Sequence, residues 1–337
     1  MKDDRLVGFL KIARRLAVDA GRPPPQALEP LSGGRNNRVF LVRADDASHF
    51  VLKVYHSDPR DPRDRLAHEW GFLVHVRGQG VLSAPEPLAF DPGAHAALYS
   101  YAPGRKLSAD EIEPRHVDAA LDFVRRINVP GTIAHLPEGS EACFSLAQHL
   151  TTVERRINRL GNLDPAAPAQ VAARAFVQED LWPSWAVVRR RIEQDAERLG
   201  MSLDAPPAPG TVIASPSDFG FHNALVDGDA VTFIDFEYAG RDDPAKLACD
   251  FFCCPEVPPP ITEFDRFVNG LVTGDDAARC RLLLDAYRLK WACIVLNDFL
   301  PLGADRRAFA DQRRTAERCE AQLARARSIV DLVETQP

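Results

Sequence analysis

The length, composition and charge of the chain exclude several classes of protein. Its 337 residues are 45% hydrophobic and 26% charged, as in an ordinary globular protein large enough for two lobes that each bury a core. The formal net charge of −7 argues against nucleic acid as the main partner, no apolar run approaches the roughly 18 residues that a membrane-spanning helix needs, and the N-terminal residues do not resemble a signal peptide.

The first hundred residues predict one helix followed by a small sheet. Residues 3–19 place apolar side chains on one helical face, and the three prolines at 23–25 end that helix. Apolar runs bounded by polar, glycine or proline turns then indicate strands within 31–42, 50–55, 84–90 and 96–102. Together these runs predict an antiparallel sheet of about five strands.

A glycine turn between the first strands is a candidate phosphate-binding loop. It contains Gly33 and Gly34, followed by Arg35, Asn36 and Asn37. Glycines beside short polar side chains let backbone N–H groups approach phosphate oxygens closely. Hairpins also use glycine for conformational reasons, so the pair by itself leaves an ordinary turn open.

Lys53 stands inside an apolar strand of a chain that strongly favours arginine, since only six of the 41 basic residues are lysines. One interpretation is an edge-strand lysine that points into solvent. The other is a point charge aimed at nucleotide phosphates and held by a carboxylate. Glu69 could supply that carboxylate, because it lies in a helix predicted over residues 61–77.

The Pro103-Gly104 break after the last strand predicts a hinge over residues 101–106. The hinge divides the chain into an N-lobe, residues 1–102, and a mostly helical C-lobe, residues 103–337. An adenine is expected to bond the backbone at the hinge. The residues expected there are Ser100, Tyr101 and Ala102.

Beyond the hinge the apolar spacing becomes helical. The 3.6-residue period appears over 114–128, 144–160, 167–180, 184–199, 262–271, 276–299 and 304–334, with an irregular polar segment at 129–142. Trp182 and Trp185 could line a substrate pocket, although anchoring the core is the favoured interpretation. The apolar stripe of the last helix could pair two chains, but packing on its own lobe is favoured.

Residues 211–237 carry the strongest candidate for a catalytic loop. A strand at 211–214 leads to Asp218 and Asn223, and a hairpin that turns at residues 227–229 delivers Asp235. Asp218 with Asn223 five residues later, followed by an Asp-Phe pair, is the spacing of a kinase catalytic loop and metal-binding turn. Such oxygen donors suit Mg²⁺ and a substrate hydroxyl. Asp and Asn are also common in turns, so this loop by itself could be either a catalytic loop or an ordinary turn.

The seven cysteines, an odd number without paired spacing, indicate reduced thiols and a cytoplasmic protein. Cys249, Cys253 and Cys254 could suggest a metal site. No second Cys or His pair stands at zinc-site spacing, so buried core thiols are the favoured interpretation.

Taken together, these pieces resemble the aminoglycoside phosphotransferase and choline kinase-like superfamily of small-molecule kinases. The pieces are Gly33-Gly34, Lys53, Glu69, Asp218 with Asn223, and Asp235-Phe236-Glu237. The resemblance covers roughly residues 28–255, and the phrase at 234–238 is similar to choline and ethanolamine kinases. It implies an α+β, protein-kinase-like bilobal fold and transfer of the γ-phosphate of ATP to a hydroxyl of a small molecule such as a sugar, an amino alcohol or an aminoglycoside.

The resemblance also implies roles for the site residues. Lys53, held by Glu69, would bind the α- and β-phosphates, and the turn from Gly33 to Asn37 would cover them. Asn223 and Asp235 would hold Mg²⁺. Asp218 would orient the acceptor hydroxyl and receive its proton.

Two features qualify the resemblance. The family usually has His-Gly or His-Asn before the catalytic Asp, whereas Pro216-Ser217 stand here, which leaves an inactive nucleotide-binding pseudokinase as the alternative. Only residues 236–243 separate Asp235 from Pro244, where a helix is expected to begin at Asp243 as its N-cap. This is too short for the peptide platform of a protein kinase.

Two further points stay open from the sequence. Glu237 and Asp242 leave room for a cationic acceptor, although structural roles for both are as reasonable. The chain could act as a monomer or as a homodimer.

Overall fold

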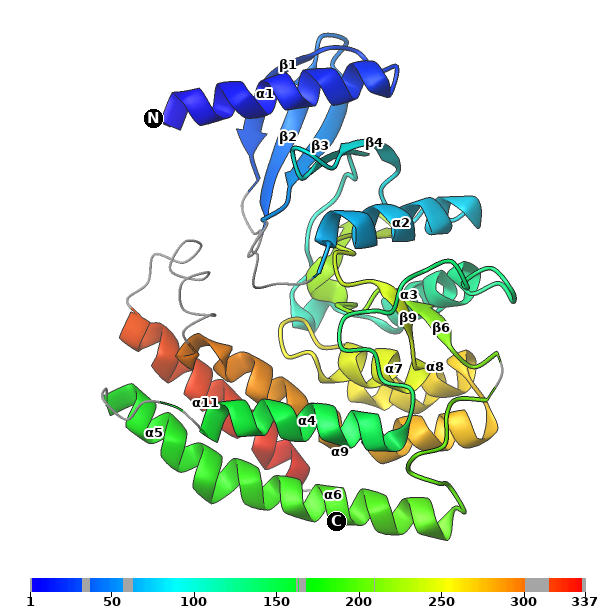
Figure 1. The fold of residues 1–337 in the computed structure, drawn as a ribbon, viewed down its shortest axis with the longest axis vertical. Helices are drawn as coiled ribbons and strands as arrows, with labels where there is room; N and C mark the ends of the chain where they lie inside the picture. The colour runs from blue at the N-terminus through cyan, green and yellow to red at the C-terminus, as the bar shows by residue number, and fades with distance from the viewer. Residues whose placement is uncertain are drawn as a thin grey trace.

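The computed structural model describes residues 2–31, 37–56, 63–161, 163, 168–208, 210–300 and 315–334. It confirms the mixed α+β architecture: a five-stranded antiparallel sheet comes first, and a mostly helical part follows (Figure 1). The predicted loop residues Gly33, Gly34, Arg35 and Asn36 lie outside the described residues.

The N-terminal sheet has the order β1-β2-β3-β5-β4, so that β3 is its central strand. The strands are β1 (Pro25–Pro30), β2 (Arg38–Ala44), β3 (His49–Val54), β4 (Pro87–Asp91) and β5 (Ala96–Ser100). Helix α1 (Lys2–Asp19) covers one face and packs on Phe50 and Leu52 of β3. Because side chains alternate along a strand, Lys53 points to the other face, toward α2 (Arg65–Gly78). The edge-strand interpretation of Lys53 is therefore wrong.

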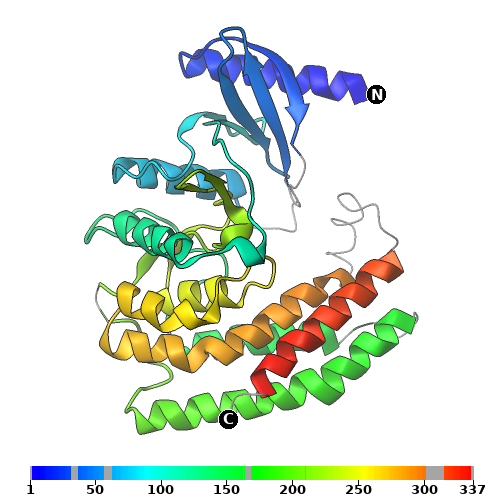
Figure 2. The ribbon, with the colours of Figure 1, turned by 180° about the vertical axis from the view of Figure 1, so that it is seen from behind.

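The C-terminal part is built around helix α9, which packs against five other helices of the described part. Its helices are α3 (Pro114–Ile127), α4 (Leu146–Gly161), α5 (Pro168–Phe176), α6 (Trp182–Arg198), α7 (Pro244–Cys253), α8 (Phe264–Leu271), α9 (Gly274–Val295) and α11 (Thr315–Glu334). Figure 2 shows α6, α9 and α11 side by side at the end of the molecule remote from the sheet. The described helices lie where the sequence predicts them, while residues 61–62 and 304–314 of two predicted helices lie outside the described residues. No helix in the described part is both long and apolar enough to cross a membrane.

Two predictions about packing in this part are confirmed. Trp185 is 1% exposed and belongs to the hydrophobic core, so it anchors the core and does not line an open pocket. The apolar stripe of α11, which includes Leu323, Ala326 and Val330, is buried on the neighbouring helices of its own chain.

Two short strand pairs carry the candidate catalytic segment between these parts. Strands β7 (Ala224–Asp227) and β8 (Ala230–Phe233) form the predicted hairpin, while β6 (Ile213–Ser215) pairs with β9 (Gly240–Asp242). The irregular segment before α4 pairs with β9 as well, because Gly139 N donates to Arg241 O at 3.0 Å. A Cβ on Gly240 would lie 2.5 Å from Gly139 N, so only glycine permits this approach.

Buried ion pairs fix the helix that follows this segment. Asp243 is the N-cap of α7 and accepts a hydrogen bond from Ala245 N at 2.7 Å, as predicted. Lys246 Nζ lies 2.6 Å from Asp242 Oδ2, and Lys290 of α9 lies 2.8 Å from Asp250 Oδ2. These charges are paired, so the desolvation cost of burying them is offset and α7 is held on α9.

Glu141 ties the irregular segment to α4 through Arg156, whose Nε lies 3.1 Å from Glu141 Oε2. Burial raises the pKa of Glu141, but Arg156 and Lys290 lower it more, to about 2. Since this pKa lies below the unfolded value of 4.5, the ion pair stabilises the fold above pH 4.5 and loses its effect as the pH falls toward 2.

We predict that Glu141→Gln lowers the free energy of unfolding at pH 7 by about 1.5–3 kcal/mol, the worth of hydrogen bonds to a charged group. The difference from the wild type should shrink as the pH falls from about 4.5 to about 2. Urea unfolding at several pH values measures it. The control is Glu113→Gln, which removes an exposed pair with Arg115 and should change stability little. A loss of unfolding free energy in Glu141→Gln that does not depend on pH would contradict a stabilising ion pair between Glu141 and Arg156.

Candidate active site

Lys53 lies at the centre of the candidate site and contacts two carboxylates. Its Nζ is 2.6 Å from Glu69 Oε2 on α2 and 2.6 Å from Asp235 Oδ1, which follows β8. The sheet, the helix and the catalytic segment therefore meet at one cation, as the sequence predicts for Lys53 and Glu69. Asp235 adopts a left-handed backbone conformation (φ 69°), which Asp tolerates better than most residues. This conformation has an energetic cost, which the surrounding structure must offset.

The surroundings keep Lys53 charged. Burial by itself would lower the pKa of this lysine, but Asp235 and Glu69 raise it well above its ordinary value. Behind the pair, Tyr55 OH donates to Glu69 Oε2 at 2.7 Å and lies 2.7 Å from Tyr99 OH. The sequence pattern does not identify these two tyrosines, because a strand tyrosine is commonly an ordinary core residue.

The candidate catalytic loop brings Asp218 and Asn223 together. Asn223 Nδ2 donates to the backbone oxygen of Asp218 at 3.0 Å and lies 3.4 Å from its Oδ2. The side chain of Asp218 is 35% exposed and that of Asp235 is 38% exposed, whereas Lys53 is only 8% exposed. The two carboxylates thus face solvent from an otherwise buried site, where they can meet a ligand.

The donor set fits a magnesium ion that is shared with a nucleotide. Ile234 N donates to Asn223 O at 2.9 Å, which holds the strand that ends at Asp235 against the loop that carries Asn223. Among the described residues, no group of three or more His, Cys, Asp and Glu side chains is placed to hold a metal by itself. Mg²⁺ is commonly bound through one or two carboxylates together with substrate phosphates and water, which is what Asp235 and Asn223 offer.

Asn37, which directly precedes β2, contacts the segment that follows β8, and sequence reasoning missed this contact. Its Nδ2 donates to Glu237 Oε2 at 2.5 Å, and Arg65 NH1 lies 3.6 Å from the same oxygen. The two partners are 200 residues apart, and nothing in their local patterns pairs them. Glu237 therefore joins the strand after the glycine turn to the start of α2.

This arrangement also settles the question of the acidic residues near the site. Glu237 is 3% exposed and faces Arg65, while Asp242 is fully buried and faces Lys246. Both have structural roles. Of the two interpretations that the sequence leaves open, the structure favours these structural roles, because neither carboxylate reaches the surface.

The predicted adenine-binding residues lie at the end of β5 and just beyond it. The backbone N–H of Ser100 donates to Glu86 O at 2.9 Å, so this donor is already used within the sheet. Tyr101 is 43% exposed. Beyond them, Arg105 exchanges two backbone hydrogen bonds with Val226 of β7, 3.0 and 2.9 Å long, which ties the predicted hinge to the catalytic hairpin.

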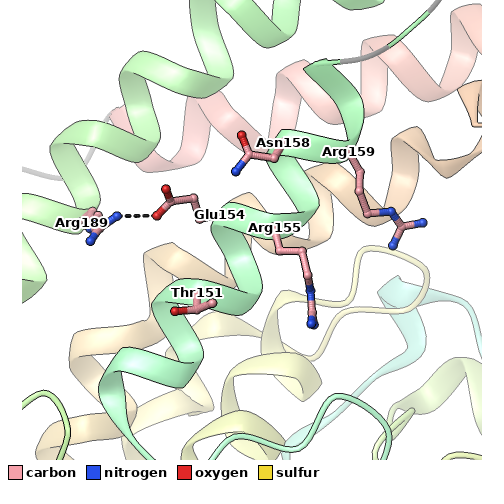
Figure 3. Close-up of a pocket in the computed structure, with 6 residues that line it drawn as sticks. All are labelled: Thr151, Glu154, Arg155, Asn158, Arg159 and Arg189. Atoms are coloured by element: carbon pink, nitrogen blue, oxygen red, sulfur yellow. Dashed lines mark hydrogen bonds and ion pairs between the residues drawn. The ribbon is translucent and has the colours of Figure 1, made fainter.

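One cavity lies apart from these residues. It has a volume of about 600 Å³ and is lined by Thr151, Glu154, Arg155, Asn158, Arg159 and Arg189, none of which belongs to the predicted site (Figure 3). Figure 3 shows five of these side chains on α4 and Arg189 on α6, with Arg189 paired to Glu154. We interpret this cavity as a solvated surface with ion pairs. The candidate functional site is instead the place where Lys53 meets Glu69 and Asp235.

Comparison with known proteins gives the family. Residues 27–283 match the phosphotransferase enzyme family, and the protein belongs to this family. No curated protein sequence matches the chain significantly.

Solved structures give the same fold. A choline/ethanolamine kinase family protein from Mesorhizobium loti aligns with a TM-score of 0.53 and 20% identity over 91% of this chain and 93% of that one. Spectinomycin phosphotransferase in complex with ADP and spectinomycin aligns at 0.57, with 13% identity over 93% and 97%. Amicoumacin kinase with AMP-PNP and Ca²⁺ aligns at 0.54, with 15% identity over 92% and 89%. These likenesses confirm the kinase-like fold.

We predict that Lys53→Met destabilises the protein by about 3–5 kcal/mol, because it leaves the buried Glu69 without its cation. The double variant Lys53→Met/Glu69→Met should lose less, since the charge that loses its partner is then only that of Asp235, which is 38% exposed and can be solvated. Urea unfolding measures both, with the exposed Lys106→Met as the control. If the double variant is less stable than Lys53→Met, the loss of stability does not come from the unpaired carboxylate of Glu69.

Proposed function

We propose that the protein is an ATP-dependent phosphotransferase that transfers the γ-phosphate of ATP to a hydroxyl of a small molecule. The observation that carries the proposal is the 2.6 Å contact of Lys53 Nζ with both Glu69 and Asp235. A strand lysine oriented by a helix carboxylate, beside a partly exposed metal-type carboxylate, is the arrangement that phosphoryl transfer requires. The complexes of two related structures with ADP and with AMP-PNP and Ca²⁺ support the choice of ligands.

Positioning and charge neutralisation would carry the reaction, because a loose phosphoryl-transfer transition state leaves the protein little covalent work. Lys53 would bind the α- and β-phosphates, and the segment from Gly33 to Asn37 would cover them. Asn223 and Asp235 would hold Mg²⁺, which when bound neutralises charge on the phosphate oxygens. Asp218 would orient the acceptor hydroxyl and accept its proton.

The nucleotide would lie between the two lobes, which we place at residues 1–102 and 103–337. The adenine would meet the backbone beyond β5. Because the Ser100 N–H is engaged with Glu86, Tyr101 and Ala102 are the better candidates for this contact.

The acceptor is proposed to be a small molecule and not a protein. Eight residues (236–243) connect Asp235 to α7 and would span at most about 28 Å if fully extended. These residues are also held to the segment before α4 by backbone hydrogen bonds. Tyr238 O accepts from Ser140 N at 2.9 Å, and Arg241 N donates to Pro137 O at 2.7 Å. No platform for an extended peptide fits into this connection, and a sugar, an amino alcohol or an aminoglycoside remains as the class of acceptor.

The proposed cellular setting is the cytoplasm. All seven cysteines are buried and none forms a disulfide, which supports a reducing compartment. The net charge of −7 supports a small-molecule substrate over nucleic acid. Both a monomer and a homodimer are compatible with this proposal.

We predict that Asp218→Asn leaves the affinity for ATP nearly unchanged, because Asp218 is assigned to the acceptor alone. Turnover should fall by about 10²–10⁴-fold, the range expected when general-base help is lost. Calorimetry of Mg-ATP binding and a coupled assay of ADP release measure the two effects. Near-normal turnover would remove Asp218 from the mechanism.

We predict that Asp235→Asn abolishes the Mg²⁺ dependence of ATP binding while the fold is kept. Asn tolerates the left-handed conformation at this position, so the change removes a charge without new backbone strain. Titration of ATP with and without Mg²⁺ measures the effect, and thermal unfolding checks the fold. If Mg-ATP binding is unaltered, Asp235 is not a metal ligand.

An acceptor screen tests the proposal as a whole. The protein is incubated with Mg-ATP and sugars, amino alcohols or aminoglycosides in one set, and with peptide and protein libraries in another. We expect ADP release and a phosphate mass shift only in the first set. Peptide phosphorylation alone would overturn the small-molecule assignment. Tight Mg-ATP binding without turnover on any acceptor, including a metabolite extract, would favour the inactive nucleotide-binding alternative.

A further inference from the structure

We propose that His222 is a positioning residue that holds the carboxylate of Asp218 toward the acceptor, an inference that rests on the proposed function of Asp218. His222 Nε2 lies 3.3 Å from Asp218 Oδ1, and its other ring nitrogen, Nδ1, lies 3.5 Å from the sulfur of Cys254. The imidazole thus bridges the catalytic loop and the end of α7. Its side chain is only 12% exposed, which limits competition from water.

The two residues before Asp218 do not give this support. Pro216 has no side-chain donor, and the buried Ser217 Oγ has no hydrogen-bond partner among the described residues. The backbone there is tightly turned, since Ser217 has a φ of 64° and Asp218 N donates to Pro216 O at 2.9 Å. A side chain that fixes Asp218 must therefore come from elsewhere, and His222 is within reach.

The loop is built to admit the imidazole ring. A Cβ on Gly220 would lie 2.7 Å from His222 Nδ1 and 2.9 Å from its Cε1, so no other residue fits at this position while the ring stays where it is. Gly220 has an extended backbone (φ 173°), which any residue can adopt, so space and not conformation explains the glycine. Next to it, Phe221 is 1% exposed and packs on Phe251 with ring centroids 5.3 Å apart, which anchors the backbone of His222.

The geometry divides the two oxygens of Asp218 between different tasks. Oδ1 accepts from the His222 ring, while Oδ2 has the weaker 3.4 Å contact with Asn223 Nδ2. Because the Asp218 side chain is 35% exposed, an acceptor hydroxyl can reach the carboxylate without displacing the imidazole. His222 is therefore expected to act on turnover through Asp218 and not on nucleotide binding.

The test is a double-mutant cycle in the full-length protein, read as ADP release with the acceptor found in the screen described above. His222→Ala should lower kcat by about 10–100-fold, the usual loss when the partner that orients a functional group is removed, with the KM for Mg-ATP unchanged. His222→Gln, which keeps a donor near the position of Nε2, should recover most of the rate. In the Asp218→Asn background, His222→Ala should cause little further loss, because the group that it orients is already gone.

The matched control is His116→Gln. His116 is buried in the same neighbourhood, where its ring packs edge-on against Phe221 at 6.3 Å, and its Nδ1 accepts from Glu113 N at 3.0 Å at the start of α3. This variant should lower the thermal midpoint without lowering kcat. Equal losses from His222→Ala in the wild-type and Asp218→Asn backgrounds, or no rescue by His222→Gln, would overturn the proposal and leave Asp218 in place. Full activity of Asp218→Asn would overturn both assignments together.

Discussion

The site depends on the burial of a single ammonium group between carboxylates from two halves of the chain. Glu69 comes from the N-terminal helix α2, and Asp235 comes from the hairpin of the C-terminal part. At a sheet edge or on the surface, water would compete with the contacts between these charges. In a buried setting the attraction is strong, but it is offset by desolvation, so the arrangement is better explained by positioning than by stability. Phe236 N adds to it by donating to Glu69 Oε1 at 3.3 Å.

The helical half provides the rigid base that this contact needs. Strand β9 is paired with β6 on one side and with residues 137–139 on the other, and the helix that follows is fixed to α9 by the buried pair of Lys290 and Asp250. Phenylalanine rings fill the space beneath the loop, with Phe219 and Phe233 only 4.8 Å apart between centroids. A close-packed core of this kind does not deform continuously, so it provides a rigid support for the loop that carries Asp218.

Sequence reasoning succeeds where function requires a residue type at a fixed local spacing. Asp218 and Asn223 lie on one short loop, so their contact could be anticipated. Lys53 is unusual in its strand, so a carboxylate partner such as Glu69 could be anticipated as well. It fails where the partner is set by tertiary packing: Asn37 with Glu237, and His222 with Cys254, are joined across 200 and 32 residues. The buried Asp242 shows the same limit, because exposure cannot be inferred from a charge and its neighbours along the chain.

The brevity of the connection between Asp235 and α7 has a consequence for control of the protein. Kinase-like proteins are commonly switched by a long segment that is disordered in one state and becomes ordered by modification or by a partner. Here the corresponding residues are paired on both sides of β9, and they end directly in a capped helix. Such a connection is short and held by backbone hydrogen bonds, so a switch of that kind is not expected here. Under the proposed function, the rate of phosphate transfer should follow the abundance of the protein and the supply of its substrates, without a lag while this segment becomes ordered.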